Sequence, residues 1–292
     1  MNKMQNVFIL GNPRSGTSLF RLLLNAHSRI VVPPESGFSH WWLNKYKDWK
    51  PTDSQTPRID EFILDVLSSK KIETWELDKN KLLKTIINAN PLNYMELINT
   101  VYLSFSNSKS EIQVIADKNN YYINHLNDLL DIWPNAKFIH LVRDGRDVAC
   151  SYIKVNTLNK GTKYIPKLSV KIEEIANEWS NNLQKIDSFF QKRKKPDVHT
   201  LRYEDLVVNP KETLDDCCAF LEQNYEPTML AYFENNDKQY TEPEATIAWK
   251  QKTKEAIDSQ NIMKYKKELS KQDIELFNKI ASMQLKKYNY MI

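Results

Sequence analysis

Two glycines frame a loop that could hold a phosphate group. The loop reads Gly11-Asn12-Pro13-Arg14-Ser15-Gly16-Thr17-Ser18 and lies between an apolar run and a segment with helical spacing. Backbone N–H groups can point at a phosphate where a tight turn opens a helix. The spacing matches the pattern G-x-x-x-x-G-K-[ST], but Thr17 takes the place of the lysine. Because that lysine contacts the β- and γ-phosphates in ATPases and kinases, the loop disfavours ordinary triphosphate hydrolysis and makes Arg14 the candidate cation. A tight turn without a ligand is the alternative.

A second candidate anion site follows the most strand-like run of the chain, Lys137–Val142. Arg143 comes directly after this run, and Ser151 lies eight residues later, about two turns along a predicted helix. An arginine at a strand tip and a hydroxyl on the next helix can converge on one phosphate, the arginine through charge-assisted and bidentate bonds. The alternative is a surface ion pair of Arg143 with Asp144 or Asp147.

Short apolar runs that alternate with helical patterns must position these loops. The predicted strands are Val7–Leu10, Ile30–Val32, Ile112–Ala116, Lys137–Val142 and Val198–Leu201. Helices are predicted for Leu19–Ala26, Arg58–Ser69, Leu77–Ala89, Leu92–Ser106, Asn124–Ile132, Lys211–Leu221 and Ser270–Tyr288, for a segment capped by Asp144 that runs to Lys154, and for an amphipathic stripe from Leu168 to Ile186. This alternation predicts an α/β fold: one domain over residues 1–292, with a P-loop-type, mainly parallel sheet flanked by helices. Residues from about 38 to 110 read as mostly helical and irregular.

Charge is concentrated near the C-terminus. The net charge is +4, and residues 248–292 hold ten Lys against five Asp plus Glu, which leaves the rest of the chain near neutral. The Lys-rich segment is either a solvated helix face or an electropositive flank for an anionic ligand. Three cysteines and five histidines show no metal-ligand spacing, so we expect no metal site and free thiols in a reducing, cytoplasmic compartment. No apolar run approaches ~18 residues, so we expect no transmembrane segment and no secretory signal.

The loop and its flanks, from Val7 to Leu23, resemble the 5′-phosphosulfate loop of sulfotransferases that use 3′-phosphoadenosine 5′-phosphosulfate (PAPS), most closely the tyrosylprotein sulfotransferase branch and its bacterial relatives. The block from Lys137 to Ser151 resembles the 3′-phosphate motif of the same family. A third block, Leu201–Leu206, is similar to the segment whose tyrosine contacts the adenosine end. The resemblance runs from Val7 to about Leu221, resumes faintly at Lys264–Tyr265, and is poor over residues 45–110.

The resemblance implies that PAPS is the co-substrate and that no metal is needed. It assigns PAPS binding to the following residues: Arg14, Ser15, Gly16, Thr17, Ser18, Arg143, Ser151 and Tyr203. Glu35, just past the second strand, matches the base of the tyrosylprotein branch. Lys118 matches the lysine that stabilises the bridging oxygen, assisted by Arg14. Asn120 stands where cytosolic small-molecule sulfotransferases have their catalytic histidine, and this difference favours the carboxylate base.

The implied activity is transfer of a sulfuryl group to a hydroxyl, or less readily an amine. The acceptor class stays open between carbohydrate, peptide tyrosine, lipid and small phenol or alcohol. The aromatic-rich stretch Phe38–Trp49, including His40, is either an acceptor wall or ordinary packing. Which tail lysine reaches the nucleotide (Lys250, Lys252, Lys254 or Lys264) is also open. Two other functions compete: a kinase or NTPase with a degenerate loop, and a polyanion- or nucleic-acid-binding protein that uses the tail. We expect no nucleic-acid partner.

Overall fold

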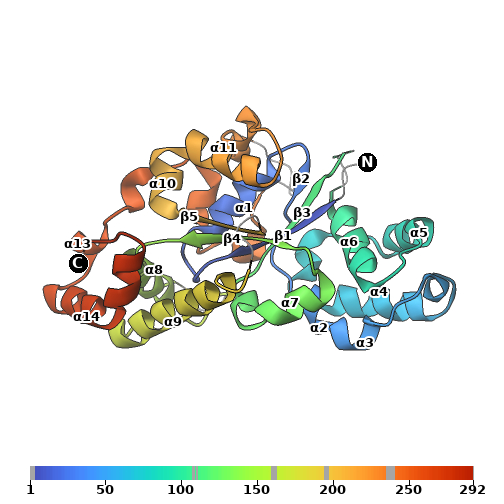
Figure 1. The fold of residues 1–292 in the computed structure, drawn as a ribbon, viewed down its shortest axis with the longest axis horizontal. Helices are drawn as coiled ribbons and strands as arrows, with labels where there is room; N and C mark the ends of the chain where they lie inside the picture. The colour runs from blue at the N-terminus through green and yellow to red at the C-terminus, as the bar shows by residue number, and fades with distance from the viewer. Residues whose placement is uncertain are drawn as a thin grey trace.

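A five-stranded, all-parallel sheet forms the centre of the molecule, in the order β2-β3-β1-β4-β5 (Figure 1). This computed structural model describes residues 4–106, 109, 111–158, 163–193, 197–234 and 241–291. The strands are β1 (Gln5–Leu10), β2 (Ile30–Val31), β3 (Val114–Lys118), β4 (Lys137–Val142) and β5 (Val198–Arg202). The chain moves from β1 outward to β2 and β3 on one side and then to β4 and β5 on the other. The end of β1 is therefore the switch point at which such sheets bind ligands.

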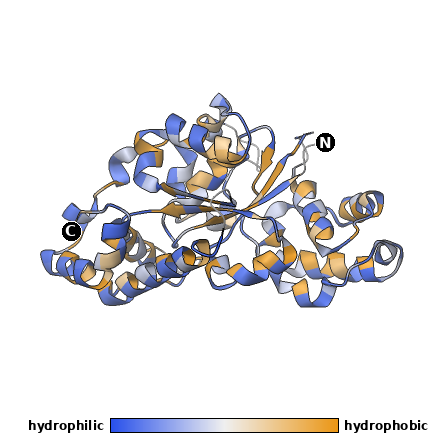
Figure 2. Cartoon of the chain, viewed as in Figure 1, coloured by the Kyte–Doolittle hydropathy of each residue, from blue (hydrophilic) through white to orange (hydrophobic). Residues whose placement is uncertain are grey.

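Alternation along β1 divides the core between the two faces of the sheet. Val7 and Ile9 point to one face, while Phe8 and Leu10 point to the other. The first face is covered by α1 (Thr17–Asn25), α10 (Tyr203–Val208) and α11 (Pro210–Phe220). The second is covered by α7 (Leu126–Ile132), α9 (Ile172–Phe190) and the helices that follow β2. Figure 2 shows the apolar colour gathered on the strands and on the inward stripes of the helices.

Residues 38–105 form a helical lobe beside the β2 side of the sheet (Figure 1). Its helices are α2 (Phe38–Trp41), α3 (Leu43–Tyr46), α4 (Arg58–Ser68), α5 (Lys79–Ala89) and α6 (Tyr94–Phe105), with the 3-10 turns η1 (Pro51–Gln55) and η2 (Ile72–Trp75) between them. Their buried aromatic and aliphatic side chains are continuous with one face of the sheet. The lobe therefore belongs to the same core.

The C-terminal part packs at the β5 side. Helix α8 (Gly145–Asn156) lies against α9 and α14 (Lys271–Lys287), and their shared core includes Trp179 and Phe277. Between α11 and α14 lie the short helices α12 (Glu244–Ile247) and α13 (Tyr265–Glu268) and several 3-10 turns: η5 (Pro227–Met229), η6 (Tyr232–Glu234), η8 (Gln251–Lys254) and η9 (Ser259–Asn261). Within the described part of the chain, no helix has the length and apolar character needed to cross a membrane.

The predicted α/β fold with its parallel sheet is confirmed, and each predicted strand is present with ends shifted by at most two residues. Asp144 caps α8 as expected, its carboxylate accepting from the Arg146 N–H at 2.9 Å. Leu168 lies before α9 rather than in it, and the short helices α2, α3 and α10 were not predicted.

Candidate active site

The loop between β1 and α1 has the conformation of an anion-binding turn. Arg14 and Gly16 both adopt the left-handed region, with φ of 69° and 95°. The Ser15 N–H donates to the Asn12 carbonyl at 3.1 Å, and α1 starts at Thr17. A Cβ on Gly16 would lie 2.4 Å from the Tyr203 ring, so only glycine fits at this position. A non-glycine residue such as Arg14 in this region is strained, which is common at ligand-binding turns.

Four of the predicted nucleotide-binding side chains meet beside this loop. The Arg14 Nε–H donates to Ser151 Oγ at 3.0 Å, and Arg143 NH1 donates to the Arg14 carbonyl at 3.1 Å. The Arg143 guanidinium also lies 4.3 Å from the centre of the Tyr203 ring. Burial and the neighbouring charge of Arg143 lower the pKa of Arg14 to about 10. Two arginines held this close to each other are suited to an anion with more than one negative charge.

The ion pairs considered as an alternative for Arg143 are not formed in the described structure. The Asp144 carboxylate binds Arg146, with Arg146 NH2 at 2.7 Å from Oδ2. Asp147 accepts from the backbone N–H groups of Met263 and Tyr265. Both acids are therefore occupied in holding α8 and the C-terminal segment, and Arg143 faces the loop.

Two buried polar atoms at this position lack a partner among the described residues: Ser15 Oγ and Arg143 Nε. A buried donor without a hydrogen bond costs about 1–3 kcal/mol, so native structures rarely leave one unsatisfied. Both belong to residues that the sequence assigned to phosphate binding. Arg143 lines the cavity described below, where an anion could accept from its Nε–H, whereas Ser15 does not line it.

Glu35 and Lys118 lie beside the same loop, next to Ser18. The Lys118 ammonium, at the end of β3, donates to Glu35 Oε1 and to Ser18 Oγ. Lys71, just before η2, donates to the other carboxylate oxygen at 2.7 Å. Although burial opposes ionisation of Glu35, Lys118, Lys250 and Lys71 together hold its pKa well below the usual value. Burial lowers the pKa of Lys118 to about 8, against the attraction of Glu35.

The residue before Lys118 also bears on the NTPase alternative. Asp117 is the next-to-last residue of β3, the strand next to β1, near where an NTPase would hold its magnesium ligand. Its carboxylate instead accepts from the Tyr122 hydroxyl at 2.6 Å and from the Tyr102 hydroxyl. Burial raises the pKa of Asp117 to about 6. Asp117 therefore faces a buried tyrosine pair, away from the loop.

The Lys-rich segment folds over the loop through a buried charge network. Arg21, on α1, donates through Nε to Glu242 Oε1 at 3.1 Å, and Lys250 donates to the other oxygen at 2.6 Å. Because Lys250 and Arg21 outweigh its burial, the pKa of Glu242 falls to about 2. The Trp249 carbonyl accepts from Arg14 NH2 at 2.8 Å. This network fixes Lys250 at the site.

One cavity of about 490 Å³ lies between the loop, the Glu35–Lys118 pair and the Lys-rich segment. Every predicted site residue lines it except Ser15, which lies within the loop; the lining members are Arg14, Gly16, Thr17, Ser18, Glu35, Lys118, Arg143, Ser151 and Tyr203. Among the four candidate tail lysines, Lys250, Lys252 and Lys264 line it and Lys254 does not. Asn120 lines it too, and its buried Oδ1 has no partner in the described part of the chain.

Sequence reasoning missed Lys71, Glu242 and Arg21. Lys71 and Glu242 lie outside the matched motifs, so no local signal marked them. Arg21 lies within the first block but has no motif role. Its buried position on α1 was a possible signal, since an arginine on an apolar helix face needs an acidic partner.

The aromatic stretch Phe38–Trp49 contributes none of the described residues that line this cavity. Trp49 is buried against Phe62, and the Trp42 indole donates to Ser69. His40 points toward Asp128 instead. Packing, the alternative to an acceptor wall, describes these residues better.

The chain matches known proteins over most of its length. Residues 6–227 match the model of the sulfotransferase family. Protein-tyrosine sulfotransferase 1 of Danio rerio is 26% identical over 236 residues, covering 79% of this chain and 57% of that protein. The Drosophila melanogaster protein-tyrosine sulfotransferase is 24% identical over 233 residues, covering 80% of this chain and 41% of that protein. The chain thus spans about half the length of these curated relatives.

Solved structures share the fold. The sulfotransferase domain from the curacin biosynthetic pathway aligns with a TM-score of 0.62 at 21% identity, over 97% of this chain and 98% of that one. Mouse sulfotransferase SULT7A1 complexed with PAP aligns with a TM-score of 0.54 at 13% identity, over 96% of this chain and 84% of that one. With the family model matched from before the phosphate loop to beyond Tyr203, the chain belongs to the sulfotransferase family.

Proposed function

We propose that the chain transfers a sulfuryl group from PAPS to a hydroxyl acceptor, with Glu35 as the general base and without a catalytic metal. The observation that carries this proposal is convergence: the loop, the Arg143–Ser151 pair and the Glu35–Lys118 pair come from four separate segments and line one cavity. A sulfuryl transfer needs a base, positive charge at the leaving group and in-line placement. The cavity supplies residues for each.

The donor set fits PAPS. Arg14 and Arg143 supply positive charge beside the Ser151 hydroxyl, and Arg143 Nε has no partner among the described residues. This arrangement suits the 3′-phosphate. The loop from Ser15 to Ser18, with the unpartnered Ser15 Oγ, suits the 5′-phosphosulfate. In this structure Arg14 reaches Ser151 rather than the Glu35 end, so we assign it first to the 3′-phosphate. When bound, PAPS would supply an activated sulfuryl group on a nucleotide leaving group.

The Glu35–Lys118 pair must separate before either residue can act. A base works best when its pKa lies near the working pH, and the pKa of Glu35 is held far below that by its lysine partners. A phosphosulfate at the loop would compete for the Lys118 ammonium. The carboxylate would then be left to accept the acceptor proton, while Lys118 neutralises the bridging oxygen. We therefore propose that the nucleotide binds before the acceptor.

Two relatives are protein-tyrosine sulfotransferases by name. We propose peptide tyrosine, carbohydrate, lipid and small phenol or alcohol as the acceptor classes to be tested. A cytoplasmic location also remains a proposal. It rests on three cysteines that are free and buried. The hydrogen bond between Asp117 and Tyr122 argues against an NTPase, because it occupies the candidate magnesium ligand. The tail lysines that line the cavity argue against a separate polyanion-binding surface.

Thermal shift with adenosine 3′,5′-bisphosphate (PAP), with and without Mg²⁺, tests the proposal. We expect a metal-independent rise in Tm for the wild type that is lost in Arg143→Ala and kept in Arg29→Ala, a surface control. No rise in the wild type, or a rise that requires Mg²⁺ with ATP, would overturn it. Labelled PAPS with a panel of the four acceptor classes then identifies the substrate.

A further inference from the structure

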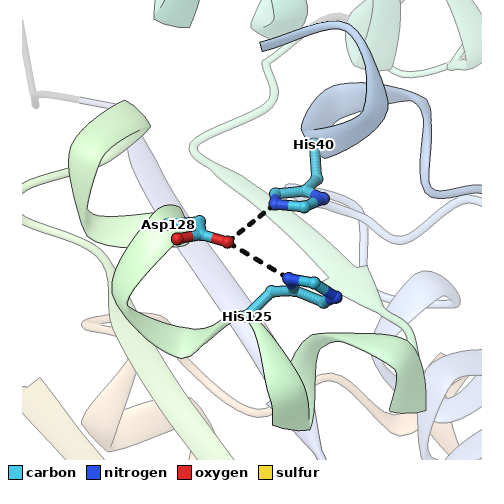
Figure 3. A group of neighbouring side chains, drawn as sticks. All are labelled: His40, His125 and Asp128. Atoms are coloured by element: carbon cyan, nitrogen blue, oxygen red, sulfur yellow. Dashed lines mark hydrogen bonds and ion pairs between the residues drawn. The ribbon is translucent and has the colours of Figure 1, made fainter. Parts of the chain in front are cut away.

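Two histidines and an aspartate meet on the far side of α2, away from the cavity described above. His40 lies on α2, His125 caps α7, and Asp128 lies on the first turn of α7. Asp128 Oδ2 is 2.8 Å from His40 Nε2 and 3.1 Å from His125 Nδ1. Figure 3 shows the three side chains pointing toward one another. One donor atom from each lies within 4.8 Å of the others.

Sequence spacing could not show this cluster. His125 and Asp128 are three residues apart, which places them on one face of a helix, but the third member comes from a distant segment. The sequence has no metal-ligand spacing, and the fold nevertheless assembles a His-His-Asp group. Such a group is a common donor set for zinc and for other first-row divalent metals.

The surroundings orient the donors. The Tyr121 hydroxyl lies 3.0 Å from His40 Nδ1, and its ring packs 4.3 Å from that of His125. A hydrogen bond to the remote nitrogen is how proteins fix the orientation of a metal-binding imidazole.

The cluster is also accessible from solvent. The side chains of His40, His125 and Asp128 are 16%, 28% and 44% exposed. His125 and Asp128 line an open surface cavity of about 570 Å³. The cationic Lys185 lines the same cavity, but its ammonium donates to Asn124 at 2.7 Å. A metal ion could enter, and water could complete its coordination.

We propose that His40 Nε2, His125 Nδ1 and Asp128 form a binding site for a divalent first-row transition metal, for which Zn²⁺ is the best match. Donor atoms around a tetrahedral zinc lie about 3.3 Å apart, given bonds of ~2.0–2.1 Å. Binding therefore needs Asp128 Oδ2 to move a few tenths of an ångström away from each imidazole nitrogen, while the two nitrogens already lie within 4.8 Å of each other. It displaces the imidazole protons that now face Asp128, and His40 Nδ1–H then donates to the Tyr121 hydroxyl.

The metal would join the two segments that carry the proposed catalytic pair. Helix α2 begins three residues after Glu35, and His125 follows Lys118 by seven. None of the three ligands lines the nucleotide cavity. The site is thus a structural link, and it stands or falls independently of the proposed sulfuryl transfer.

The test is titration of the full chain, stripped with a chelator, with Zn²⁺ by calorimetry and with Co²⁺ by absorption spectroscopy. We expect one ion per chain, visible Co²⁺ d–d bands, and no competition from millimolar Mg²⁺, which prefers oxygen ligands. His125→Gln and Asp128→Asn should each weaken Zn²⁺ binding about tenfold or more. His199→Gln, whose ring stacks on Phe220 elsewhere, is the matched control and should bind as the wild type does.

Failure of the wild type to bind Zn²⁺ would overturn the proposal and identify the cluster as a hydrogen-bonded link between α2 and α7. Binding of unchanged affinity in both variants would place the ion elsewhere and would also overturn it. Circular dichroism of the metal-free proteins checks folding. If Asp128→Asn does not fold, the partly exposed His125→Gln carries the comparison.

Discussion

The proposed nucleotide end of the cavity, at Arg14, Arg143 and Ser151, and the proposed acceptor end, at Glu35, are built in opposite ways. At the nucleotide end, two buried side-chain atoms, Ser15 Oγ and Arg143 Nε, have no partner among the described residues, and Arg143 lines the cavity. At the acceptor end, the Glu35 carboxylate is fully engaged by Lys118 and Lys71. The first end is prepared for a ligand, whereas the second must break existing ion pairs before it works. The difference separates binding from chemistry, and variants can test it.

The largest effect is expected from Glu35→Gln, at the acceptor end. Loss of a general base typically costs 10²–10⁴-fold in rate, so we expect kcat to fall by about that amount. PAP affinity should be kept or should rise, because the Arg143 and loop contacts are untouched and Lys118 loses the carboxylate that competes for its ammonium. Labelled-PAPS turnover and calorimetry with PAP measure the two quantities. Glu73→Gln, which removes an exposed carboxylate paired with Lys163, is the control. Near-normal kcat in the Glu35→Gln variant would rule out Glu35 as the base.

Gly16→Ala should have the converse effect. The left-handed backbone and the nearby Tyr203 ring make a Cβ here unfavourable by about 1–3 kcal/mol. We expect PAP affinity to fall about tenfold or more. Gly37→Ala is the matched control, because its Cβ would also approach an aromatic ring, that of Trp41 at 2.6 Å, but at an ordinary φ and outside the loop. Equal PAP affinities for the two variants would contradict a preformed nucleotide end.

A pH profile probes Lys118, which lies between the two ends. Its pKa of about 8 means that the ammonium is lost as pH rises above 8, so PAP affinity should decline there. Stability should move the other way. Between about pH 8 and the unfolded pKa of ~10.4, the unfolded chain binds more protons at this residue than the folded chain does. The contribution of Lys118 to the free energy of unfolding therefore increases with pH in this range. Both trends should disappear in Lys118→Gln, and a flat wild-type profile would show that the pKa is not lowered.

The smallest effect is expected from Lys71→Met. Lys71 lowers the pKa of Glu35, so its removal raises that pKa and moves the acidic limb of the kcat/KM profile to higher pH. The value of kcat at neutral pH should stay nearly unchanged. Lys163→Met, on the exposed partner of Glu73, should leave the limb in place. A downward movement for Lys71→Met would mean that Lys71 does not stabilise the carboxylate.

That the residues of the proposed nucleotide end meet at one cavity was predictable, because they follow strands and lie in short local motifs. Backbone requirements there leave a mark in the sequence, such as Gly16 and the Arg143–Ser151 spacing. The contacts at the proposed acceptor end could not be predicted in this way, because Lys71 contacts Glu35 from the helical lobe, where no sequence motif was found. Glu242 and the His40–His125–Asp128 group were missed for the same reason. These contacts depend on long-range packing that no local pattern encodes.

The prolines after β2 have a further consequence for substrate recognition. β2 is the edge strand, and Val32 beyond it already donates to Asn25 and accepts from Arg21. Pro33 and Pro34 have no N–H, and the Pro34 carbonyl accepts from the Trp75 indole. A peptide therefore cannot extend the sheet as an added strand on the approach to Glu35. An acceptor at the proposed base Glu35 would therefore not be held by strand pairing with residues 32–34.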